Sequence, residues 1–436
     1  MEMQNHLTES HSVSQNGIGP LAGAEAPPIP GCAVQRPAKP LLDMRHQKRS
    51  LHILTRFFVC AALCAFLASG LSAVESTAKT KKKKHHTAVA AQTVTVTKVS
   101  TTRRVRRHVY SPWTEPTYAD STSGDNVDGE DLTVRRAAVE ALGAFNGSVV
   151  VVDPDSGRIL TMVNQKLALG GGFTPCSTIK VSVALAALQE KLIDQTTKIR
   201  LYGRTKMALT EALARSNNYY FANLGVQLGY ERFNYYARLF GYGETAGLDI
   251  PGERPGYFPP APPKNGGMGM LTSFGEEISQ TPLELAALIS AVANGGTLYY
   301  LQYPKNQEEI DHFTPRVKRE LEIKDQIAEI KPGMEGAVDF GTAHRARQEE
   351  VIMGKTGTCS EARTHLGWFG SFNDSGPNKL VVVVLLTGGR PSIGPMAAGV
   401  AGDVYRHLAQ ENYFAANHHT AFTPATLVAT PMCCAR

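Results

Sequence analysis

Hydrophobic and polar residues follow clear periods only between about residues 131 and 411. The stretch 132–145 carries apolar residues at helical spacing, which predicts a helix. Two apolar runs around an Asp-Ser-Gly turn follow it and predict a β-hairpin over 147–163. Several helices are predicted next, and the first of them is apolar on most faces, which indicates a buried helix. These helices cover 177–192, most of 209–240, and 281–296.

Three further apolar segments lie near the end of this region and are predicted strands. A polar turn, Asn373–Asn378, separates the last two strands, and a final helix is predicted at about 393–410. This order of elements indicates an α+β fold, with one sheet assembled from both ends of the domain. The predicted strands are 351–360, 365–372 and 379–389.

An apolar run near the N-terminus has the features of a secretory signal. Eighteen uncharged residues, Phe57–Val74, follow basic residues and end in small ones. The same length is also just enough for a tilted span across ~30 Å of hydrocarbon. We therefore predict that 44–74 is a signal peptide or membrane anchor, and that the protein is exported to an extracytoplasmic or periplasmic location. Because Met44 begins a better-proportioned signal than the residues before it, we hypothesise that translation starts there.

The remaining segments differ from the periodic region in composition. Residues 1–43 are polar and rich in Pro, which predicts a disordered tail. Residues 75–130 are basic and then rich in Ser, Thr and Gly, which predicts a linker: either a solvated spacer or a segment lying on an anionic surface. Residues 412–436 have no period and are predicted to be a flexible tail. The folded domain is therefore expected over 131–411.

Composition and charge narrow the classes of function. Of the 436 residues, 42% are hydrophobic and 19% are charged, which excludes disorder of the whole chain. The formal net charge is +6, but the basic residues gather in 75–110, and the body after this segment is mildly acidic. This distribution argues against a nucleic-acid partner. No HExxH motif occurs, and the paired histidines lie in the predicted linker and tail, so no metal or other cofactor is expected.

Ser177 and Lys180 form an S-x-x-K pair at the start of a predicted helix. Residues three apart share a helix face, so the lysine amine can reach the serine hydroxyl. A desolvated lysine with a lowered pKa can then activate the serine as a nucleophile. The same pattern also occurs by chance, as a helix cap followed by a surface lysine.

Two further motifs follow, Ser216–Asn218 and Lys355–Thr358. Taken alone, the first is typical of a polar cap that opens a helix. The second lies on a predicted strand, where Gly357 would permit close approach by a ligand. A Lys/Thr pair suits a carboxylate, although an edge strand with a solubilising lysine would have the same sequence.

The three motifs occur in the order S-x-x-K, S-x-N, K-T-G, and together they resemble the penicillin-binding transpeptidase family, whose motif set class A β-lactamases share. The resemblance covers about residues 131–411. It implies a β-lactamase/transpeptidase-like α+β fold: an antiparallel sheet of about five strands flanked by helices, and a mostly helical subdomain with the active site between them. Other similar segments are FGYGETAGLDIPGE (240–253), SFGEEISQTPLELAALISAVANGG (273–296), FGTA (340–343) and WFGSF (368–372).

By this resemblance, Ser177 attacks the carbonyl of D-Ala–D-Ala in a peptidoglycan stem peptide, or a β-lactam ring. Lys180 would remove the Ser177 proton. Ser216 would pass a proton to the leaving amine, and Asn218 would hold the substrate amide and orient Lys180. The enzyme is a transpeptidase if an amine accepts the acyl group, and a carboxypeptidase if water does.

The K-T-G strand completes the expected site. Lys355 and Thr356 would receive the substrate carboxylate, and Gly357 belongs to the same substrate-binding segment. The oxyanion would lie between the backbone N–H groups of Ser177 and Thr358. The expected partners are stem peptides, β-lactams as inhibitors, and the membrane if the N-terminal apolar segment is not cleaved. The sequence names no protein partner.

Two other functions share parts of this pattern. A class A β-lactamase needs an additional general base in an E-x-x-L-N segment after the second motif, and no such segment is present. A non-catalytic β-lactam sensor is expected to carry more transmembrane helices than the single candidate here. Both remain as alternatives.

Two of the seven cysteines, Cys176 and Cys359, lie in the expected domain. Their pairing resembles a disulfide of class A carbapenemases that joins the corresponding positions. Export would provide the oxidising compartment that a disulfide requires. The alternative is a pair of buried free thiols.

Overall fold

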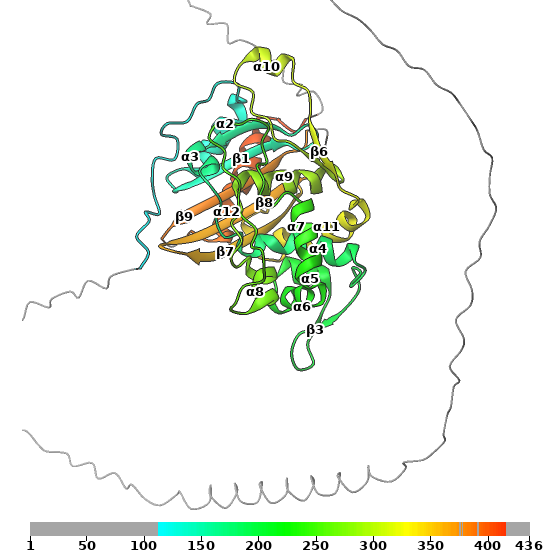
Figure 1. Ribbon diagram of the computed structural model, residues 1–436. Helices are drawn as coiled ribbons and strands as arrows, with labels where there is room; N and C mark the ends of the chain where they lie inside the picture. The colour runs from blue at the N-terminus through cyan, green and yellow to red at the C-terminus, as the bar shows by residue number, and fades with distance from the viewer. Residues whose placement is uncertain (1–111, 375, 377, 390–391, 416–436) are drawn as a thin grey trace, which may run out of the picture. The chain divides into compact units, whose positions relative to one another are not determined.

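The computed structural model describes residues 112–374, 376, 378–389 and 392–415 (Figure 1). The predicted tail 1–43 and the predicted signal or anchor 44–74 lie outside these residues, as do most of the predicted linker and the C-terminal tail. Among the helices of the described part, none combines the length and the apolar character needed to cross a bilayer.

A five-stranded antiparallel sheet forms the centre of the domain. Its order is β2-β1-β9-β8-β7, so the hairpin from the start of the domain pairs with strands from its end, as predicted. β7 is an edge strand, which leaves one side of its backbone outside the sheet. The strands are β1 (Gly147–Asp153), β2 (Arg158–Val163), β7 (Ile352–Glu361), β8 (Thr364–Asn373) and β9 (Val381–Gly388).

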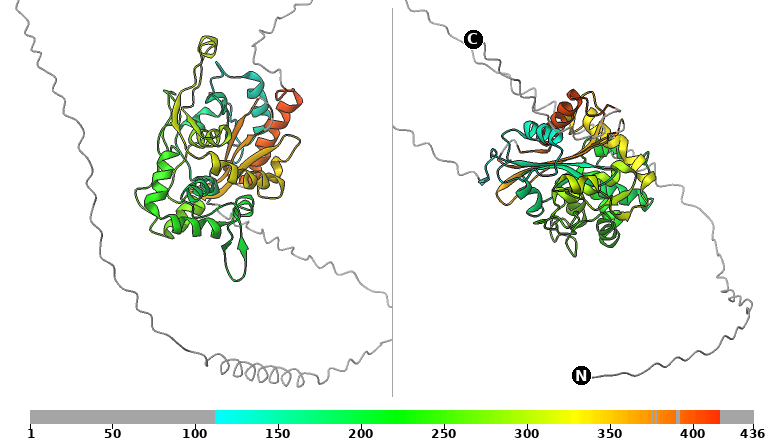
Figure 2. Two further views of the ribbon diagram at one scale, coloured as in Figure 1. Left: turned by 90° about the vertical axis from the view of Figure 1, so that its right-hand side faces the viewer. Right: turned by 90° about the horizontal axis from the view of Figure 1, so that it is seen from above.

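Helices cover both faces of this sheet (Figure 2). α2 (Leu132–Leu142) and α12 (Gly394–Gln410) contact each other and one face, whereas α9 (Pro282–Asn294) contacts the other. Successive valines of β1 belong alternately to the core beneath α2 and α12 and to the core beneath α9. Because both faces are buried, β1 and β9 are continuous apolar runs rather than alternating sequences.

A mostly helical part of the domain shares the core beneath α9. α4 is buried along nearly all of its length, in agreement with its apolar sequence. The predicted helical stretch 209–240 is divided into three helices, with breaks at 215–217 and at Gly229. The elements of this part are η1 (Cys176–Ile179, a 3-10 turn), α4 (Lys180–Gln189), α5 (Leu209–Ala214), α6 (Asn218–Leu228), α7 (Tyr230–Leu239), α8 (Gly267–Phe274) and α11 (Lys324–Asp339).

The shorter elements connect these layers. β3 pairs with β4 and β5 pairs with β6, each in a separate two-stranded sheet. The shorter elements are α3 (Gln165–Leu169), β3 (Ile199–Arg200), β4 (Lys206–Met207), β5 (Thr297–Tyr299), α10 (Gln307–Asp311), β6 (Val317–Glu320) and η2 (His344–Ala346).

The ends of α9 follow from local sequence. The Thr281 hydroxyl accepts a hydrogen bond from the Glu284 N–H, and the Glu284 carboxylate accepts one from the Thr281 N–H, which together form a capping box. Pro282 occupies the first turn, where its missing N–H has no helical partner. Gly295 ends the helix with a φ of 93°. This helix was predicted over 281–296.

The ordered domain is longer at both ends than predicted. Before the expected start, Asp125 forms an ion pair with Arg135 at 2.7 Å. Glu130 is buried and accepts hydrogen bonds from β2. After the expected end, Tyr413 is also buried. The segment before the domain has few apolar residues and no period, so its sequence predicted a linker. Its carboxylates nevertheless have partners inside the domain.

Candidate active site

The three motifs come together where the edge strand β7 meets the helical part. Ser177 lies in η1, the 3-10 turn directly before α4, whereas the sequence predicted an α-helix from residue 177 onward; Lys180 opens α4. η1 contacts β7, the strand that carries Lys355. Ser216 lies between α5 and α6, and Asn218 is the first residue of α6.

The amine of Lys180 is the centre of a hydrogen-bond network. Its Nζ lies 2.9 Å from Ser177 Oγ and 2.5 Å from Asn218 Oδ1. It also lies 2.9 Å from the Ser216 carbonyl oxygen and 3.1 Å from Ser216 Oγ. Carbonyl oxygens can only accept, so Lys180 donates to Asn218 and to the Ser216 carbonyl. These two bonds use two of the three hydrogen-bonding sites of the Lys180 Nζ. The third site is left for the hydroxyls of Ser177 and Ser216.

A second lysine, Lys355, reaches the same site from β7. Its Nζ lies 2.9 Å from Ser216 Oγ and donates to the Thr356 carbonyl oxygen at 3.0 Å. Lys355 and Lys180 are both fully buried. The Ser216 hydroxyl therefore lies between two lysine amines.

Burial lowers the pKa of both lysines, because a charged amine loses its hydration there. Desolvation, and after it the nearby charge of Lys355, lowers the pKa of Lys180 from 10.5 to about 6. Desolvation lowers the pKa of Lys355 to about 7. Burial thus favours the neutral form of Lys180. In that form it carries a lone pair that can accept a proton from Ser177.

Two residues of the site adopt a left-handed backbone conformation. Cys176, directly before the candidate nucleophile, has a φ of 52°, and Ser216 has a φ of 55°. For a residue with a side chain this conformation costs about 1–2 kcal/mol. It persists only where the surrounding structure holds it.

Hydroxyl groups of β7 form hydrogen bonds to the connection after α11 and to the start of α12. Thr356 Oγ1 lies 2.6 Å from Thr342 Oγ1, and Thr358 Oγ1 accepts a hydrogen bond from the Gly394 N–H at 2.8 Å. A Cβ on Gly394 would lie 2.7 Å from the Gly357 carbonyl oxygen, so the start of α12 can approach β7 only with glycine there. Thr342 was missed as a site residue, although it lies in the FGTA segment that was recognised in the sequence.

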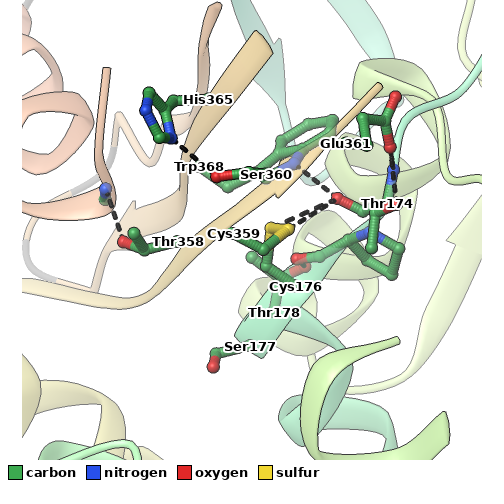
Figure 3. Close-up of a disulfide and its surroundings, with 12 residues drawn as sticks. Thr174, Cys176, Ser177, Thr178, Thr358, Cys359, Ser360, Glu361, His365 and Trp368 are labelled. Carbon is green, nitrogen blue, oxygen red and sulfur yellow. Dashed lines mark hydrogen bonds between the residues drawn. A yellow bond between two sulfur atoms is a disulfide. The ribbon is translucent and has the colours of Figure 1, made fainter. Parts of the chain in front are cut away.

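Cys176 and Cys359 form a disulfide, with Cα atoms 5.6 Å apart (Figure 3). The pairing predicted from the resemblance is confirmed, and the alternative of two free thiols is wrong. The bond links η1 to β7. The residue before Ser177 is therefore joined covalently to the residue after Thr358.

Comparison with known proteins agrees with this geometry. The family model described as the penicillin binding protein transpeptidase domain matches residues 147–409, which is more than half of the chain. The chain belongs to this family. The matched region contains all three motifs, and the family predicted from the sequence is confirmed.

Curated relatives of this transpeptidase-domain protein have low identity. Stage V sporulation protein D of Bacillus subtilis is 27% identical over 280 residues, which cover 56% of this chain and 43% of that protein. Peptidoglycan D,D-transpeptidase MrdA of Acinetobacter baumannii is 23% identical over 353 residues, which cover 63% of this chain and 52% of that protein. The chain thus spans about half the length of the curated relatives it matches.

Solved structures confirm the fold class. Pseudomonas aeruginosa PBP2, determined in complex with WCK 5153, matches with a TM-score of 0.59 at 23% identity, over 67% of this chain and 78% of that one. PBPA from Mycobacterium tuberculosis matches with a TM-score of 0.56 at 22% identity, over 65% and 82%. Both matches agree with the α+β fold that the sequence predicted for this chain.

Proposed function

We propose that this protein is a serine D,D-transpeptidase or D,D-carboxypeptidase that acts on D-Ala–D-Ala stem peptides of peptidoglycan through an acyl-enzyme on Ser177. The proposal is carried by one observation: the Lys180 amine lies 2.9 Å from Ser177 Oγ and has a pKa of about 6. A neutral amine at this distance can take the serine proton as the oxygen attacks. The D,D-transpeptidase name of a relative supports the choice of substrate.

In the acylation step, Ser177 Oγ forms a bond to the carbonyl carbon of the penultimate D-Ala, and Lys180 takes the hydroxyl proton. The backbone N–H groups of Ser177 and Thr358 stabilise the oxyanion, and one such donor is worth about 10²–10³ in rate. The C–N bond to the terminal D-Ala then breaks. Ser216, which lies between both lysines, passes a proton to the leaving amine.

Substrate binding uses the same network. The Asn218 oxygen is occupied by Lys180, which leaves the Asn218 NH₂ group to donate to the substrate amide carbonyl. The hydroxyl of Thr356 and the positive charge of Lys355 attract the terminal carboxylate. Gly357, in the same segment, lets β7 lie directly against Pro175 and Cys176, beside the nucleophile. An amine or water then releases the acyl group from Ser177.

The proposed reaction takes place outside the cytoplasm, where peptidoglycan is assembled. The disulfide supports this location, because such bonds persist in oxidising compartments. We propose that segment 44–74 directs the export, either as a cleaved signal or as an anchor.

A fluorescent penicillin tests the proposal on the full-length protein. Long-lived labelling of Ser177, together with release of D-Ala from a D-Ala–D-Ala pentapeptide, is the expected result. Ser177→Ala should abolish labelling and leave the thermal unfolding midpoint close to that of the wild type. Rapid loss of the label without D-Ala release would identify a β-lactamase instead. Stable labelling without peptide activity would identify a sensor.

A further inference from the structure

The segment before Ser177 is held against β7 and β8 (Figure 3). The N–H and the hydroxyl of Thr174 both donate to Glu361 Oε2, at 2.7 and 2.5 Å. The indole N–H of Trp368 donates to the Thr174 carbonyl oxygen at 3.0 Å. Glu361 ends β7 and Trp368 lies in β8, so the segment is anchored by residues far along the chain.

Cys176 is the last residue of this segment. Its φ of 52° lies in the left-handed region, which glycine adopts without penalty and other residues avoid. Its side chain is nevertheless fully buried and bonded to Cys359. The residue at this position thus disfavours the backbone conformation that it adopts and, at the same time, provides a covalent bond that holds it.

The backbone of β7 lies in close contact with this segment. A Cβ on Gly357 would lie 2.8 Å from the Pro175 carbonyl oxygen and 3.3 Å from the Cys176 Cβ. Such an added atom would force the neighbouring backbone to shift. A rotation of the backbone at Cys176 would therefore move Ser177 relative to the N–H of Thr358.

We propose that the Cys176–Cys359 disulfide and the Glu361 carboxylate are positioning devices for the nucleophile. Together they hold Cys176 in its left-handed conformation and keep Ser177 aligned with Lys180 and β7. This proposal rests on Ser177 being the nucleophile, as proposed above. Its consequence is specific: the acylation rate depends on the disulfide only because residue 176 is not glycine. A glycine there adopts the same φ unaided, and then the disulfide contributes to stability but not to rate.

The test compares the full-length wild type with Cys359→Ala and with the double variant Cys176→Gly/Cys359→Ala. The measurements are the second-order rate of acylation by a fluorescent penicillin and the thermal unfolding midpoint. We expect acylation of Cys359→Ala to be about 10- to 100-fold slower, because a small misplacement of a reacting group is costly. In the double variant the rate should return to within about threefold of the wild type, because glycine tolerates the backbone conformation.

The unfolding midpoint should behave differently from the rate. Both variants lack a covalent link across 183 residues, and the midpoint should stay below that of the wild type in both. If the disulfide affected acylation only by stabilising the fold, the acylation rate would follow the unfolding midpoint from one variant to the next. Recovery of the rate without recovery of the midpoint is therefore the expected signature.

A dithiol reductant allows the protein with and without the Cys176–Cys359 disulfide to be compared without substituting either cysteine. It supplies two electrons and two protons to the Cys176–Cys359 bond, which becomes two thiols, and the reductant becomes a cyclic disulfide. The reduced wild type should acylate at the rate of Cys359→Ala. The double variant should show the same rate with and without the dithiol, which controls for other effects of the reductant.

Glu361 is tested by two substitutions. Glu361→Ala removes the acceptor for both Thr174 bonds, whereas Glu361→Gln keeps an acceptor oxygen. We expect Glu361→Ala to slow acylation several-fold and Glu361→Gln to remain close to the wild type. Glu361→Ala combined with Cys359→Ala should lose more than the product of the two single losses, because each device holds the segment when the other is absent. Glu322→Ala, at an exposed glutamate, is the matched control.

Two results would overturn the proposal: equal acylation rates in the wild type and Cys359→Ala, or no recovery of rate in a folded double variant. Equal rates would assign the disulfide to stability alone, and no recovery would show that the loss of rate does not come from the backbone conformation at residue 176. Both results presuppose labelling of Ser177 in the wild type. Absence of that label, or its persistence in Ser177→Ala, would contradict the proposed function and with it the premise of this proposal. If Cys359→Ala does not fold, the dithiol-treated wild type takes its place.

Discussion

Cys176 and Ser216 have almost the same left-handed backbone, but the protein holds them differently. Cys176 is fixed by a covalent bond to β7. Ser216 is held by hydrogen bonds: its N–H donates to the Leu213 carbonyl oxygen at 3.1 Å, and its own carbonyl accepts from Lys180 at 2.9 Å. One support depends on the redox state of two sulfurs. The other depends on the lysine that also performs the proposed proton transfer.

Because of this difference, loss of the disulfide and loss of Lys180 should affect the site in different ways. By the proposal above, loss of the disulfide should disturb the position of the nucleophile but leave the two lysine amines and their pKa values in place. Loss of Lys180 removes the base and, at the same time, the hydrogen bond that supports Ser216. The two supports can therefore be separated by experiment.

Among the tests of this difference, the largest effect is expected from Lys180→Met, which keeps the volume of the side chain and removes the amine. Acylation by a fluorescent penicillin should fall by about 10²–10⁴-fold, because general-base catalysis is lost together with the support of Ser216. Cys359→Ala should fall far less. Near-normal acylation of Lys180→Met would mean that another group acts as the base.

Substitutions at Ser216 sharpen the comparison with Cys176. Ser216→Ala and Ser216→Gly both remove the hydroxyl between the two lysines, and glycine also relieves the left-handed backbone. We expect both to slow D-Ala release by about 10²-fold, because the proton relay is lost in each. Recovery of the rate in Ser216→Gly alone would show that backbone support, rather than the hydroxyl, is what this residue provides.

The pH dependence separates the two supports without mutation. An amine is protonated below its pKa and cannot act as a base, so acylation should fall as the pH drops through about 6, the pKa of Lys180. Well below this midpoint the loss is about tenfold per pH unit, as for a single proton. The dithiol-treated protein should have a lower plateau but the same midpoint. A shift of the midpoint after reduction would show that the disulfide also affects the amine.

The smallest effect is expected from Thr342→Val, which removes the hydroxyl that contacts Thr356 and keeps the shape of the side chain. Loss of one such hydrogen bond is worth about 1 kcal/mol, which corresponds to roughly a fivefold slower acylation. Thr205→Val, at an exposed threonine, is the matched control. Equal rates in the two variants would remove Thr342 from the site.

Local sequence was sufficient for the elements whose signals are short-range. The capping box and terminal glycine of α9, the hairpin of β1 and β2, and the three late strands were all predicted. α11 was not, because it contains Pro332, a residue that normally ends a helix. Its apolar residues, among them Ile330 and Met334, are buried in the core, and this packing outweighs the local preference.

By itself, the sequence determined the motif residues, their order and the family to which they belong, because these depend only on residue type and spacing. The Cys176–Cys359 pairing was also correct, although it came from resemblance to other proteins. Only the tertiary structure decided that Glu361 binds Thr174 and that Thr342 meets Thr356. It alone decided the left-handed backbone at Cys176. These features depend on contacts between segments far apart in the chain, and no local pattern of residues encodes them.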